Sequence, residues 1–482
     1  MHDLTIHQAK ELIDSEQLSC EDLTRAILDR VKQVEPSVKS FITITEDFAL
    51  TEAKKLDQNR FNDPKKPLQG IPFQLKDNIC TQGILTTCSS KMLSGFTPPY
   101  DATVVEKLKQ AGGIMLGKGN MDEFAMGSST ENSAFYPTHN PWDLARVPGG
   151  SSGGPAAAVA AGECFYSLGS DTGGSIRQPA SLCGVVGLKP TYGLVSRYGL
   201  VAFASSLDQI GPITKDVKDC SVVLDAIVGH DSKDSTSINK VPASYADSLN
   251  KDIKGLKIGV PKEYFESGVD PKVLDCIKKS LLVFETLGAT VSETSLPLTK
   301  YALAVYYILA PSEASANLSR YDGVKYGYSY PNAETIWDAM EKTRQYGFGP
   351  EVSRRIMLGT YALSAGYYDA YYVKAQKVRT LIRNEFSCAF NDYDILITPT
   401  SPSIAFLIGE KTHDPLQMYL NDICTIPANI AGIPAMSIPS GFSEGMPVGM
   451  QIMGNYFSEN VILNAAYAFE QATEWHTMRP SL

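Results

Sequence analysis

Two glycine–serine segments lie close together in the chain and carry residue types that suit acyl-transfer chemistry. The first is Gly149–Gly154, with the sequence GGSSGG, and the second is Asp171–Ser175, with the sequence DTGGS. Serine hydroxyls supply nucleophiles, and glycines leave backbone N–H groups free to face a developing negative charge. Each segment alone is also typical of a tight turn, because glycine adopts positive φ at little cost. The pair therefore indicates either an oxyanion-stabilising site or loops that only hold an anion.

A serine nucleophile needs a base, and the sequence offers a lysine more readily than a histidine. Of the six histidines, only His139 lies near the glycine-rich region. Lysine is the known substitute, and Lys76 ends the apolar part of the segment Gly70–Asn78, GIPFQLKDN. A surface position would leave this amine charged, whereas burial would favour its neutral form, because desolvation penalises an ammonium. A catalytic role for Lys76 therefore depends on burial, which the sequence does not establish.

Two other motifs are matched only in part. Gly150–Gly154 fits the GxSxG pattern of a nucleophile elbow, which follows a strand, but Ala145–Pro148 makes a poor strand because proline lacks the donor N–H. Gly112–Lys118 approaches a phosphate-binding loop, yet Gly119 stands where serine or threonine should hold magnesium. Its interior is the apolar run Ile114–Leu116 rather than an open cradle. The sequence therefore disfavours both motifs.

The elements that must position these residues alternate along the chain. Ser19 as N-cap and apolar residues at helical spacing predict a helix over 19–34. Helix and strand patterns then alternate, which favours a largely parallel sheet covered on both faces. Because such strands occur at both ends of the chain, we expect one domain over 1–482, with a polar surface excursion at 231–254. Strands are predicted at 114–116, 164–168, 256–260, 289–291, 395–397 and 448–452, and further helices before Gly112 and at 156–160, 271–287 and 460–473.

Composition and charge narrow the class of protein. The chain has 482 residues, of which 43% are hydrophobic and 20% charged, the balance of an ordinary globular protein. Its net charge of −10 gives little help in binding nucleic acid or an anionic membrane. The nine cysteines are scattered without a CxxC pair, so no zinc site or disulfide framework is indicated, and free thiols fit a reducing compartment. With no signal-peptide pattern and no long apolar span, we expect a cytoplasmic protein without membrane contact.

The two glycine–serine segments, their spacing and the GIPFQLKDN segment resemble the amidase-signature family, over roughly residues 20–470. The resemblance implies an α/β fold with a large mixed sheet covered by helices on both faces. It also implies a catalytic triad: Lys76 as base, Ser151, with a cis peptide bond, as proton bridge, and Ser175 as nucleophile of an acyl-enzyme pathway. The oxyanion would be stabilised by the backbone of Thr172, Gly173 and Gly174.

Four further segments resemble the glutaminase subunits of tRNA-dependent amidotransferases within this family; they are 120–129, 312–323, 354–360 and 419–423. This resemblance implies that Arg355 binds the carboxylate of glutamine and that Asp422 binds its ammonium. It also implies a substrate-contacting insertion around residues 300–390. The sequence leaves open whether Arg354 replaces Arg355, whether Tyr307 replaces Tyr306, and whether Asp422 only caps a helix. The implied further contacts are Tyr306, Gly127 and Ser128.

The same resemblance implies that ammonia passes to partner chains in a heterotrimer. One partner would act as a kinase and bind tRNA, and the other would be a small linking subunit. ATP and magnesium are expected at the partner, tRNA is expected to bind mainly through partners, and neither a cofactor nor a metal is expected in this chain. The product would be amidated Glu-tRNA(Gln), and the sequence leaves Asp-tRNA(Asn) open. Two alternatives remain: a free-standing amidase for small amides, and a scaffold whose loops only bind an anion.

Overall fold

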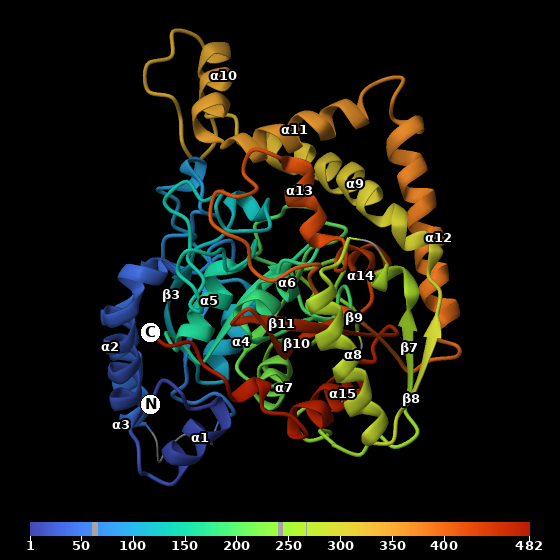
Figure 1. Ribbon diagram of the computed structural model, residues 1–482. Coiled ribbons are helices and arrows are strands. Elements are labelled where there is room, and N and C mark those ends of the chain that lie inside the picture. The colour runs from blue at the N-terminus through green and yellow to red at the C-terminus, as the bar shows by residue number, and fades with distance from the viewer. Residues whose placement is uncertain (60–65, 240–243, 267) are drawn as a thin grey trace.

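A computed structural model describes residues 1–59, 66–239, 244–266 and 268–482, and within them eleven strands form one continuous sheet. The strand order is β1-β3-β2-β4-β6-β5-β10-β11-β9-β7-β8. The sheet thus unites strands from both halves of the chain (Figure 1). The strands are β1 Phe41–Ile44, β2 Pro72–Lys76, β3 Ile114–Gly119, β4 Tyr166–Asp171, β5 Val186–Lys189, β6 Gln209–Thr214, β7 Lys257–Pro261, β8 Thr290–Thr294, β9 Ile395–Pro399, β10 Ala435–Ser443 and β11 Met446–Gly454.

The sheet is mixed, as the family resemblance implied, but the prediction of a largely parallel sheet is wrong. β2 pairs in parallel with β3 and β4, and β7 pairs in parallel with β8 and β9. The remaining pairings, which include the whole centre of the sheet, are antiparallel. One cause is the tight turn at Glu444–Gly445, where both residues have positive φ and join β10 directly to β11. A two-residue connection permits only an antiparallel pair.

Helices cover both faces of the sheet. Every residue of β2, β4 and β6 is buried, and successive side chains of a strand point to opposite faces. Both faces of these strands are therefore covered, as predicted. The α-helices of the described residues are α1 Ile6–Asp14, α2 Cys20–Val38, α3 Glu46–Gln58, α4 Thr103–Gln110, α5 Gly153–Ala161, α6 Arg177–Cys183, α7 Val217–Ile227, α8 Pro271–Thr286, α9 Ala302–Asn317, α10 Ile336–Gly347, α11 Pro350–Leu363, α12 Lys374–Ala389, α13 Pro415–Tyr419, α14 Ile426–Ala431 and α15 Glu459–Gln471.

Local sequence signals account for several helix ends. The Ser19 side chain accepts a hydrogen bond from the Asp22 amide and starts α2, the helix predicted over 19–34, which continues to Val38. α5 stops at Gly162, which takes the left-handed conformation that glycine adopts without strain. The other predicted strands and helices are also present, with ends that differ by a few residues.

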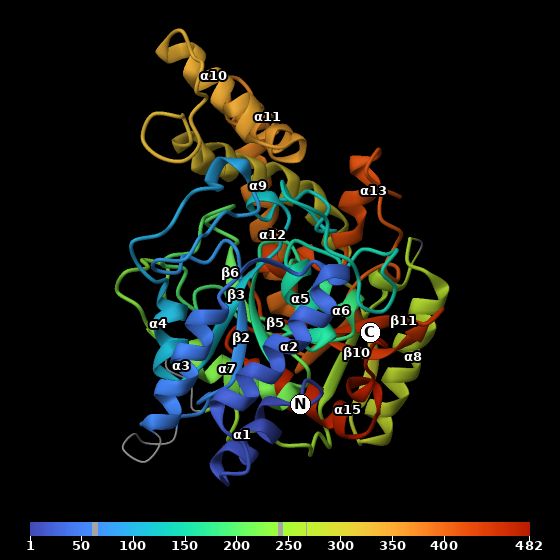
Figure 2. The same ribbon diagram turned by 90° about the vertical axis from the view of Figure 1, so that its left-hand side faces the viewer.

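Residues 302–389 form a helical layer above the sheet edge, built from α9, α10, α11 and α12 (Figures 1 and 2). This layer spans nearly the same residues as the substrate-contacting insertion predicted at 300–390, and that these residues are an insertion stays a prediction. The described part of the predicted excursion at 231–254 has no helix or strand, while residues 240–243 lie outside the described residues. Tyr245 and Ile253 are buried, so this segment packs on the body of the protein instead of projecting from it.

The chain ends lie near each other, since Arg30 Nη1 donates to the carbonyl oxygen of Leu482 close to the N-terminal residues (Figure 1). Among the residues that the structure describes, no helix combines the length and the apolar character that a membrane crossing requires.

Candidate active site

The predicted catalytic segments meet at one edge of the sheet, because three neighbouring strands end there. β2 ends at Lys76, and it lies in parallel between β3, which ends at Gly119, and β4, which ends at Asp171. Parallel neighbours place their carboxyl ends at the same edge, where α/β sheets usually hold their ligands. The segments that follow β3 and β4 therefore surround Lys76, as does the GGSSGG loop that leads into α5.

Lys76 is fully buried and contacts the first serine of GGSSGG. Its Nζ lies 2.7 Å from Ser151 Oγ and donates to the carbonyl oxygen of Ser170 at 3.2 Å. Burial lowers the pKa of the Lys76 amine from 10.5 to about 7. Three carboxyl groups oppose this shift, with Asp122 the largest influence among them. An amine with this pKa accepts a proton near neutral pH, which is the condition that the sequence left undecided.

The two glycine–serine loops pack against each other through their backbones. The Ser152 amide donates to the carbonyl oxygen of Ser175 at 3.1 Å, and the Ser152 hydroxyl donates to the carbonyl oxygen of Ser170. The peptide bond between Gly150 and Ser151 is cis. Ser175 is 8% exposed, and its hydroxyl makes no hydrogen bond to any residue that the structure describes. The Ser175 hydroxyl is therefore available to a substrate that enters from solvent.

A buried ion pair fixes the loop between β4 and Ser175. Asp171 accepts hydrogen bonds from the Gly174 amide at 2.8 Å and the Ile176 amide at 3.2 Å, and it pairs with Arg177 Nε at 3.0 Å. Burial alone would raise the pKa of the Asp171 carboxyl, but the Arg177 guanidinium holds that pKa at about 2. Asp171 takes the Gly174 amide, and the amides of Thr172, Gly173 and Ser175 are the ones in this loop left without a hydrogen-bond partner among the described residues.

Asp422 meets the segment that follows β3. The Ser128 hydroxyl donates to Asp422 Oδ2, while Asp422 Oδ1 is buried and has no hydrogen-bond partner among the described residues. Burial raises the pKa of this carboxyl to about 7. The Asp422 side chain caps no helix, because α14 begins after Thr425. The structure thus removes the helix-cap alternative and leaves a buried oxygen that an ammonium group would satisfy.

The structure also separates Arg355 from its neighbour Arg354. The Arg355 side chain is 3% exposed and its Nε donates to Glu351 Oε1 at 2.7 Å, whereas the Arg354 side chain is 43% exposed. The Arg355 guanidinium lies over the rings of Tyr307 and Tyr419, at 5.2 and 5.4 Å from their centroids. Arg355 therefore faces the interior beside Asp422, and Arg354 faces solvent.

Both candidate tyrosines lie inside, but only Tyr306 faces the nucleophile loop. A Cβ placed at Gly173 would lie 2.8 to 2.9 Å from the Tyr306 ring, so glycine permits this close approach. The Tyr307 ring instead stacks on Tyr419 at 4.0 Å, beside Arg355. The structure thus favours Tyr306 as the residue next to the reacting group and gives Tyr307 a place in the wall around Arg355.

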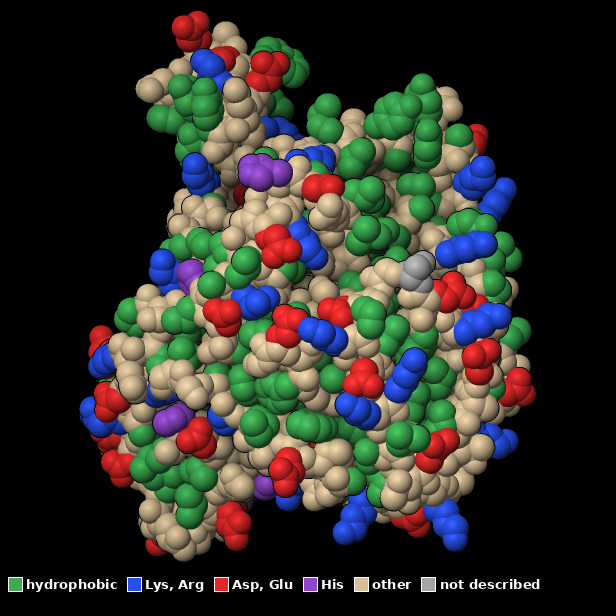
Figure 3. Space-filling view, in the orientation of Figure 1, with side chains coloured by type: hydrophobic (Ala, Val, Ile, Leu, Met, Phe, Trp, Pro, Cys, Tyr) green, Lys and Arg blue, Asp and Glu red, His purple; other side chains and the backbone are tan. Residues whose placement is uncertain are grey.

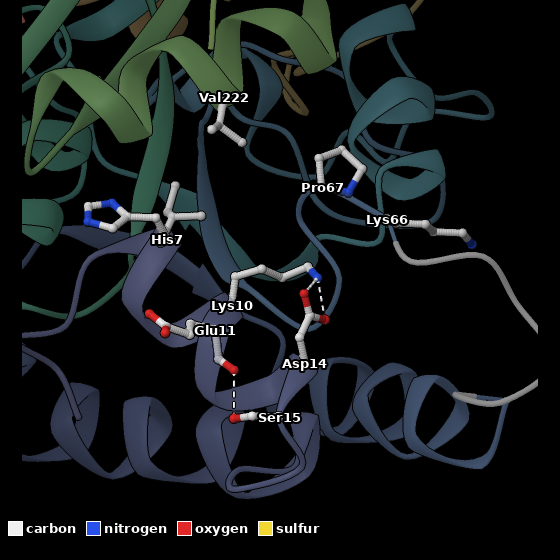
Figure 4. Close-up of a pocket in the computed structure, with 9 residues that line it drawn as sticks. His7, Lys10, Glu11, Asp14, Ser15, Lys66, Pro67 and Val222 are labelled. Carbon is white, nitrogen blue, oxygen red and sulfur yellow. Dashed lines mark hydrogen bonds and ion pairs between the residues drawn. The ribbon is translucent and has the colours of Figure 1, made fainter. Parts of the chain in front are cut away.

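A cavity of about 90 Å³ opens beside these residues and is lined by Gly127, Glu351, Arg355 and Tyr419, among others. A hollow of about 750 Å³ at α1 is larger. Figure 4 shows its lining, which includes Lys10 and Asp14, and these two side chains pair with each other. None of the predicted site residues lines that hollow. Of the predicted site residues, Gly127 and Arg355 line the small cavity next to α11.

The structure rejects the two partial motifs. Residues 145–148 precede the GGSSGG loop without forming a strand, so the nucleophile elbow lacks its required context. Residues 114–119 form β3, and Lys118 is buried, where its Nζ donates to the carbonyl oxygen of Ile79 and the hydroxyl of Thr86. A phosphate-binding loop would need this amine to be free.

Several residues of the site carried no signal in the sequence. Asp122 and Asp208 are buried carboxyl groups that act on Lys76, and Glu351 orients Arg355. The Thr425 hydroxyl donates to the carbonyl oxygen of Gly173 at 2.7 Å and so supports the nucleophile loop. Asp171, the third carboxyl group that acts on Lys76, did carry a sequence signal, because it begins the DTGGS segment. The others are distant in sequence, and only the fold brings them to the site.

In the described residues, one group of side chains has the composition of a metal site: His7, Asp216 and Asp219. The Asp219 carboxylate already accepts the backbone amides of Ile6 and His7, and His7 Nδ1 lies 2.9 Å from Asp219 Oδ1. This group joins α1 to α7 and takes no part in the candidate active site.

A buried lysine of lowered pKa, a serine in contact with it and a second serine whose hydroxyl has no partner among the described residues form an arrangement that suits amide hydrolysis. The sequence profile of the family described as Amidase matches residues 22–463. The chain belongs to this amidase family.

Relatives within the family are more specific. A protein of Moorella thermoacetica, 61% identical over 99% of this chain and 98% of its own length, is described as the A subunit of glutamyl-tRNA(Gln) amidotransferase. The crystal structure of a protein of that description from Thermotoga maritima has a TM-score of 0.83 and 47% identity, with 99% of this chain and 97% of the other covered. A peptide amidase of Stenotrophomonas maltophilia has a TM-score of 0.82 and 29% identity, with 99% and 98% covered.

Proposed function

We propose that this chain is the glutaminase subunit of a tRNA-dependent amidotransferase, and that it hydrolyses glutamine to supply ammonia for the amidation of Glu-tRNA(Gln). The full-length likeness to the glutamyl-tRNA(Gln) amidotransferase protein of Moorella thermoacetica supports this proposal. The observation that carries the chemistry is the 2.7 Å contact between the buried Lys76 amine and Ser151.

In the proposed reaction, neutral Lys76 takes a proton from Ser151 while Ser151 takes one from Ser175. The Ser175 oxygen attacks the side-chain amide carbon of glutamine, and the carbonyl oxygen becomes an oxyanion. Reversal of the proton relay protonates the leaving nitrogen, so ammonia departs and leaves an acyl-enzyme, which water then hydrolyses. Burial supports this sequence because it keeps Lys76 ready to accept a proton near pH 7.

The oxyanion is proposed to form against the backbone of residues 172–174. The amides of Thr172 and Gly173, like that of Ser175, have no hydrogen-bond partner among the described residues, while the Gly174 amide is held by Asp171. Gly174 then acts through the loop shape that Asp171 and Arg177 impose. Donors fixed in advance stabilise developing charge without having to reorganise.

Glutamine suits the residues around this point. Arg355 would bind the α-carboxylate, because its guanidinium is buried and only Nε is taken by Glu351. Asp422 Oδ1 would accept the α-ammonium, because the Ser128 hydroxyl holds the other oxygen of this carboxyl, and Gly127 lines the cavity next to Arg355. The Tyr306 ring would border the bound substrate next to Gly173.

A free-standing amidase for small amides is the second candidate, which the fold of the peptide amidase supports. Arg355 and Asp422, which suit the carboxylate and the ammonium of a free amino acid, favour glutamine over a simple amide as the substrate.

The loops are less suited to hold an anion without chemistry. Arg177 neutralises the Asp171 charge, so the amine of Lys76 is the group that would have to attract a bound anion. Burial lowers the pKa of this amine to about 7, and its neutral form carries no charge to hold an anion. We therefore place the scaffold alternative behind both enzymatic ones.

Ammonia is proposed to pass to two partner chains: a small linking subunit, and a second subunit that acts as a kinase and binds tRNA. ATP and magnesium are proposed to bind to these partners. The partial match to a phosphate-binding loop is a buried strand, which supports placing ATP elsewhere. We propose that the chain works in the cytoplasm as a single domain. The nine free cysteines and the continuous sheet support these two points.

Replacement of Ser175 by alanine tests the catalytic assignment. We expect glutamine hydrolysis to fall by several orders of magnitude, because only oxyanion stabilisation and binding remain. Ser387→Ala on α12, an exposed position, is the matched control and should keep full activity. Ammonia release that persists in the Ser175→Ala protein would remove Ser175 from the mechanism.

A second assay separates the glutaminase of an assembly from a free-standing amidase. Ammonia release from glutamine is measured with the chain alone, with its partner subunits, and with these plus ATP and Glu-tRNA(Gln). Strong stimulation by partners and formation of Gln-tRNA(Gln) are expected. Fast hydrolysis of unrelated small amides, without a response to partners, would favour the free-standing amidase.

A further inference from the structure

One surface of the helical layer exposes an unusual cluster of large side chains. The residues are Met357, Leu358 and Tyr361 on α11 and Tyr367, Tyr368 and Tyr371 in the turn that follows it, and we call them the tyrosine patch. Their exposed fractions are 70% and 44% for the first two, and 40 to 48% for the four tyrosines. Figure 3 shows hydrophobic side chains gathered over this end of the layer. Large exposed patches of this kind usually mark contact sites.

The patch is contiguous and ordered by its own contacts. The ring centroids of Tyr361 and Tyr367 lie 4.4 Å apart, and Tyr371 lies 5.9 and 6.0 Å from these two rings. Met357 and Leu358 stand one helical turn before Tyr361, so they share its face of α11. Tyr361, Tyr367 and Tyr371 thus pack on each other, while Tyr368 stacks on Tyr372 at 5.3 Å, so the ring faces are largely taken by neighbouring tyrosines. This arrangement favours a protein partner over a nucleic acid.

The exposed area is of the size that a protein interface uses. A fully buried aromatic side chain removes roughly 150–250 Å² from water, so four tyrosines at this exposure leave roughly 350 Å² open. With Met357 and Leu358, the patch reaches roughly 500 Å², against about 800 Å² that each partner contributes to a standard interface. Tyrosine is also among the residues that dominate binding energy at such interfaces.

The rim of the patch is positively charged, although the whole chain has a net charge of −10. Of the six lysine and arginine residues between 354 and 383, Arg355 is buried and Arg354 pairs with Glu351, whereas Lys374, Lys377 and Arg383 are exposed; Asp369 is the one acidic residue in this stretch. The two exposed lysines lie on α12, and the Arg354 side chain on α11 is also exposed. A partner with an acidic border around an apolar centre would complement this surface.

The patch also lies on the helix that holds the proposed substrate clamp. α11 carries Arg355 and Glu351 on its inner side and Met357, Leu358 and Tyr361 on its outer side. At Gly359 the helix touches α9 so closely that a Cβ would lie 1.9 Å from the carbonyl oxygen of Pro311. α11 therefore cannot shift at Gly359 without moving α9, and a protein bound to its outer side would contact the same helix that carries Arg355.

We propose that the tyrosine patch is the docking surface for the partner subunit that receives ammonia, a protein with an apolar, acid-bordered contact face. This inference rests on the proposed function, which makes the chain one subunit of an amidotransferase. Docking here places the consumer of ammonia against the helix that binds glutamine and so couples assembly to hydrolysis.

The test compares Tyr361→Glu and Met357→Glu with Leu282→Glu, a control at a 61% exposed leucine on α8. Affinity for the remaining subunits of the amidotransferase is measured by sedimentation or calorimetry, and glutamine hydrolysis is measured with and without them. We expect the two patch variants to bind roughly 30-fold more weakly and to lose stimulation, because loss of a central interface residue costs about 2 kcal/mol or more. Basal hydrolysis and the behaviour of Leu282→Glu should not change.

Each contrary outcome has its own meaning. If the wild-type chain hydrolyses glutamine and assembles, but the patch variants assemble equally well, the docking inference alone is wrong. If the isolated chain dimerises and Tyr361→Glu abolishes the dimer, the surface serves a second copy and the inference is overturned. Loss of tRNA binding with unchanged subunit binding would also overturn it. If the wild-type chain releases no ammonia from glutamine, the proposed function itself fails.

Discussion

The protonation of Lys76 predicts how glutamine hydrolysis depends on pH. The amine must be neutral to accept a proton, and its pKa is about 7. About nine tenths of the molecules are therefore active at pH 8, and about one tenth at pH 6, if this single group controls the reaction. We expect kcat to rise about tenfold per pH unit below pH 7 and to level off above pH 8. kcat is the quantity to follow, because it reports groups in the substrate complex, whereas kcat/KM also contains Asp422.

The charge on Asp122 should set the position of this curve. The Asp122 carboxylate accepts the amides of Thr130 and Asn132, forms no ion pair with a described residue, and is the largest charge that acts on Lys76. Asp122→Asn removes a negative charge that favours the ammonium, so the pKa of Lys76 should fall and the acid limb of kcat should move to lower pH. Glu123→Gln is the matched control. Its carboxyl is also buried, with a pKa raised to about 7, but it is not among the charges that act on Lys76.

The same burial predicts an effect on stability. Lowering the pKa of an amine from 10.5 to about 7 corresponds to at most about 5 kcal/mol. Between these two pH values the folded chain holds fewer protons on this amine than the unfolded chain, so stability rises with pH across that window. Lys76→Met removes this cost, and it should be inactive yet more resistant to urea at pH 7 by as much as a few kcal/mol, with the gain lost above pH 10.5.

Three results would refute the reasoning. A kcat that stays constant between pH 5.5 and pH 8 would mean that Lys76 does not titrate in this range, or is not the base. If Glu123→Gln moves the acid limb and Asp122→Asn does not, Asp122 is not the carboxylate that sets the pKa of Lys76. Urea unfolding of Lys76→Met that shows a loss of stability at pH 7 would contradict a costly buried amine.

The remaining predictions concern the substrate clamp and the nucleophile loop. Arg355→Gln should raise KM for glutamine by roughly 30-fold or more, because loss of a buried charged partner costs about 2 kcal/mol or more. The control Arg354→Gln should keep KM within about twofold of the unchanged protein. Steady-state kinetics measures both values, and equal effects would contradict the proposed binding of glutamine by Arg355. Asp422→Asn should raise KM much more than it lowers kcat, and a selective loss of kcat would place this residue in the chemical step. Gly174→Ala should lower both kcat and Tm, because φ at this residue is +134° and the new Cβ would lie 2.1 Å from Thr425 Oγ1. An unchanged Tm would show that the loop adjusts to the new side chain without strain.

The sequence predicted the elements better than their arrangement. The helix at Ser19 and the stop at Gly162 follow from local signals, a capping hydroxyl and a glycine, and both are present. The direction of strand pairing was wrong, because alternating helix and strand patterns say nothing about strands joined by tight turns or paired across long intervals. β4 and β6, for instance, are antiparallel neighbours across nearly forty residues of chain.

The sequence by itself determined the types of residue that do the chemistry. GIPFQLKDN, GGSSGG and DTGGS are short segments whose lysine, serines and glycines point to acyl transfer, and their resemblance to a family assigned Lys76, Ser151 and Ser175. Only the tertiary structure decided whether Lys76 is buried and has a pKa that suits a base. The pKa of Lys76 depends on burial between neighbouring strands and on the charges of Asp122, Asp171 and Asp208, which lie far away in sequence. The same holds for Arg355 against Arg354: both are arginines on one helix, and only the packing of α11 turns one inward and the other to solvent.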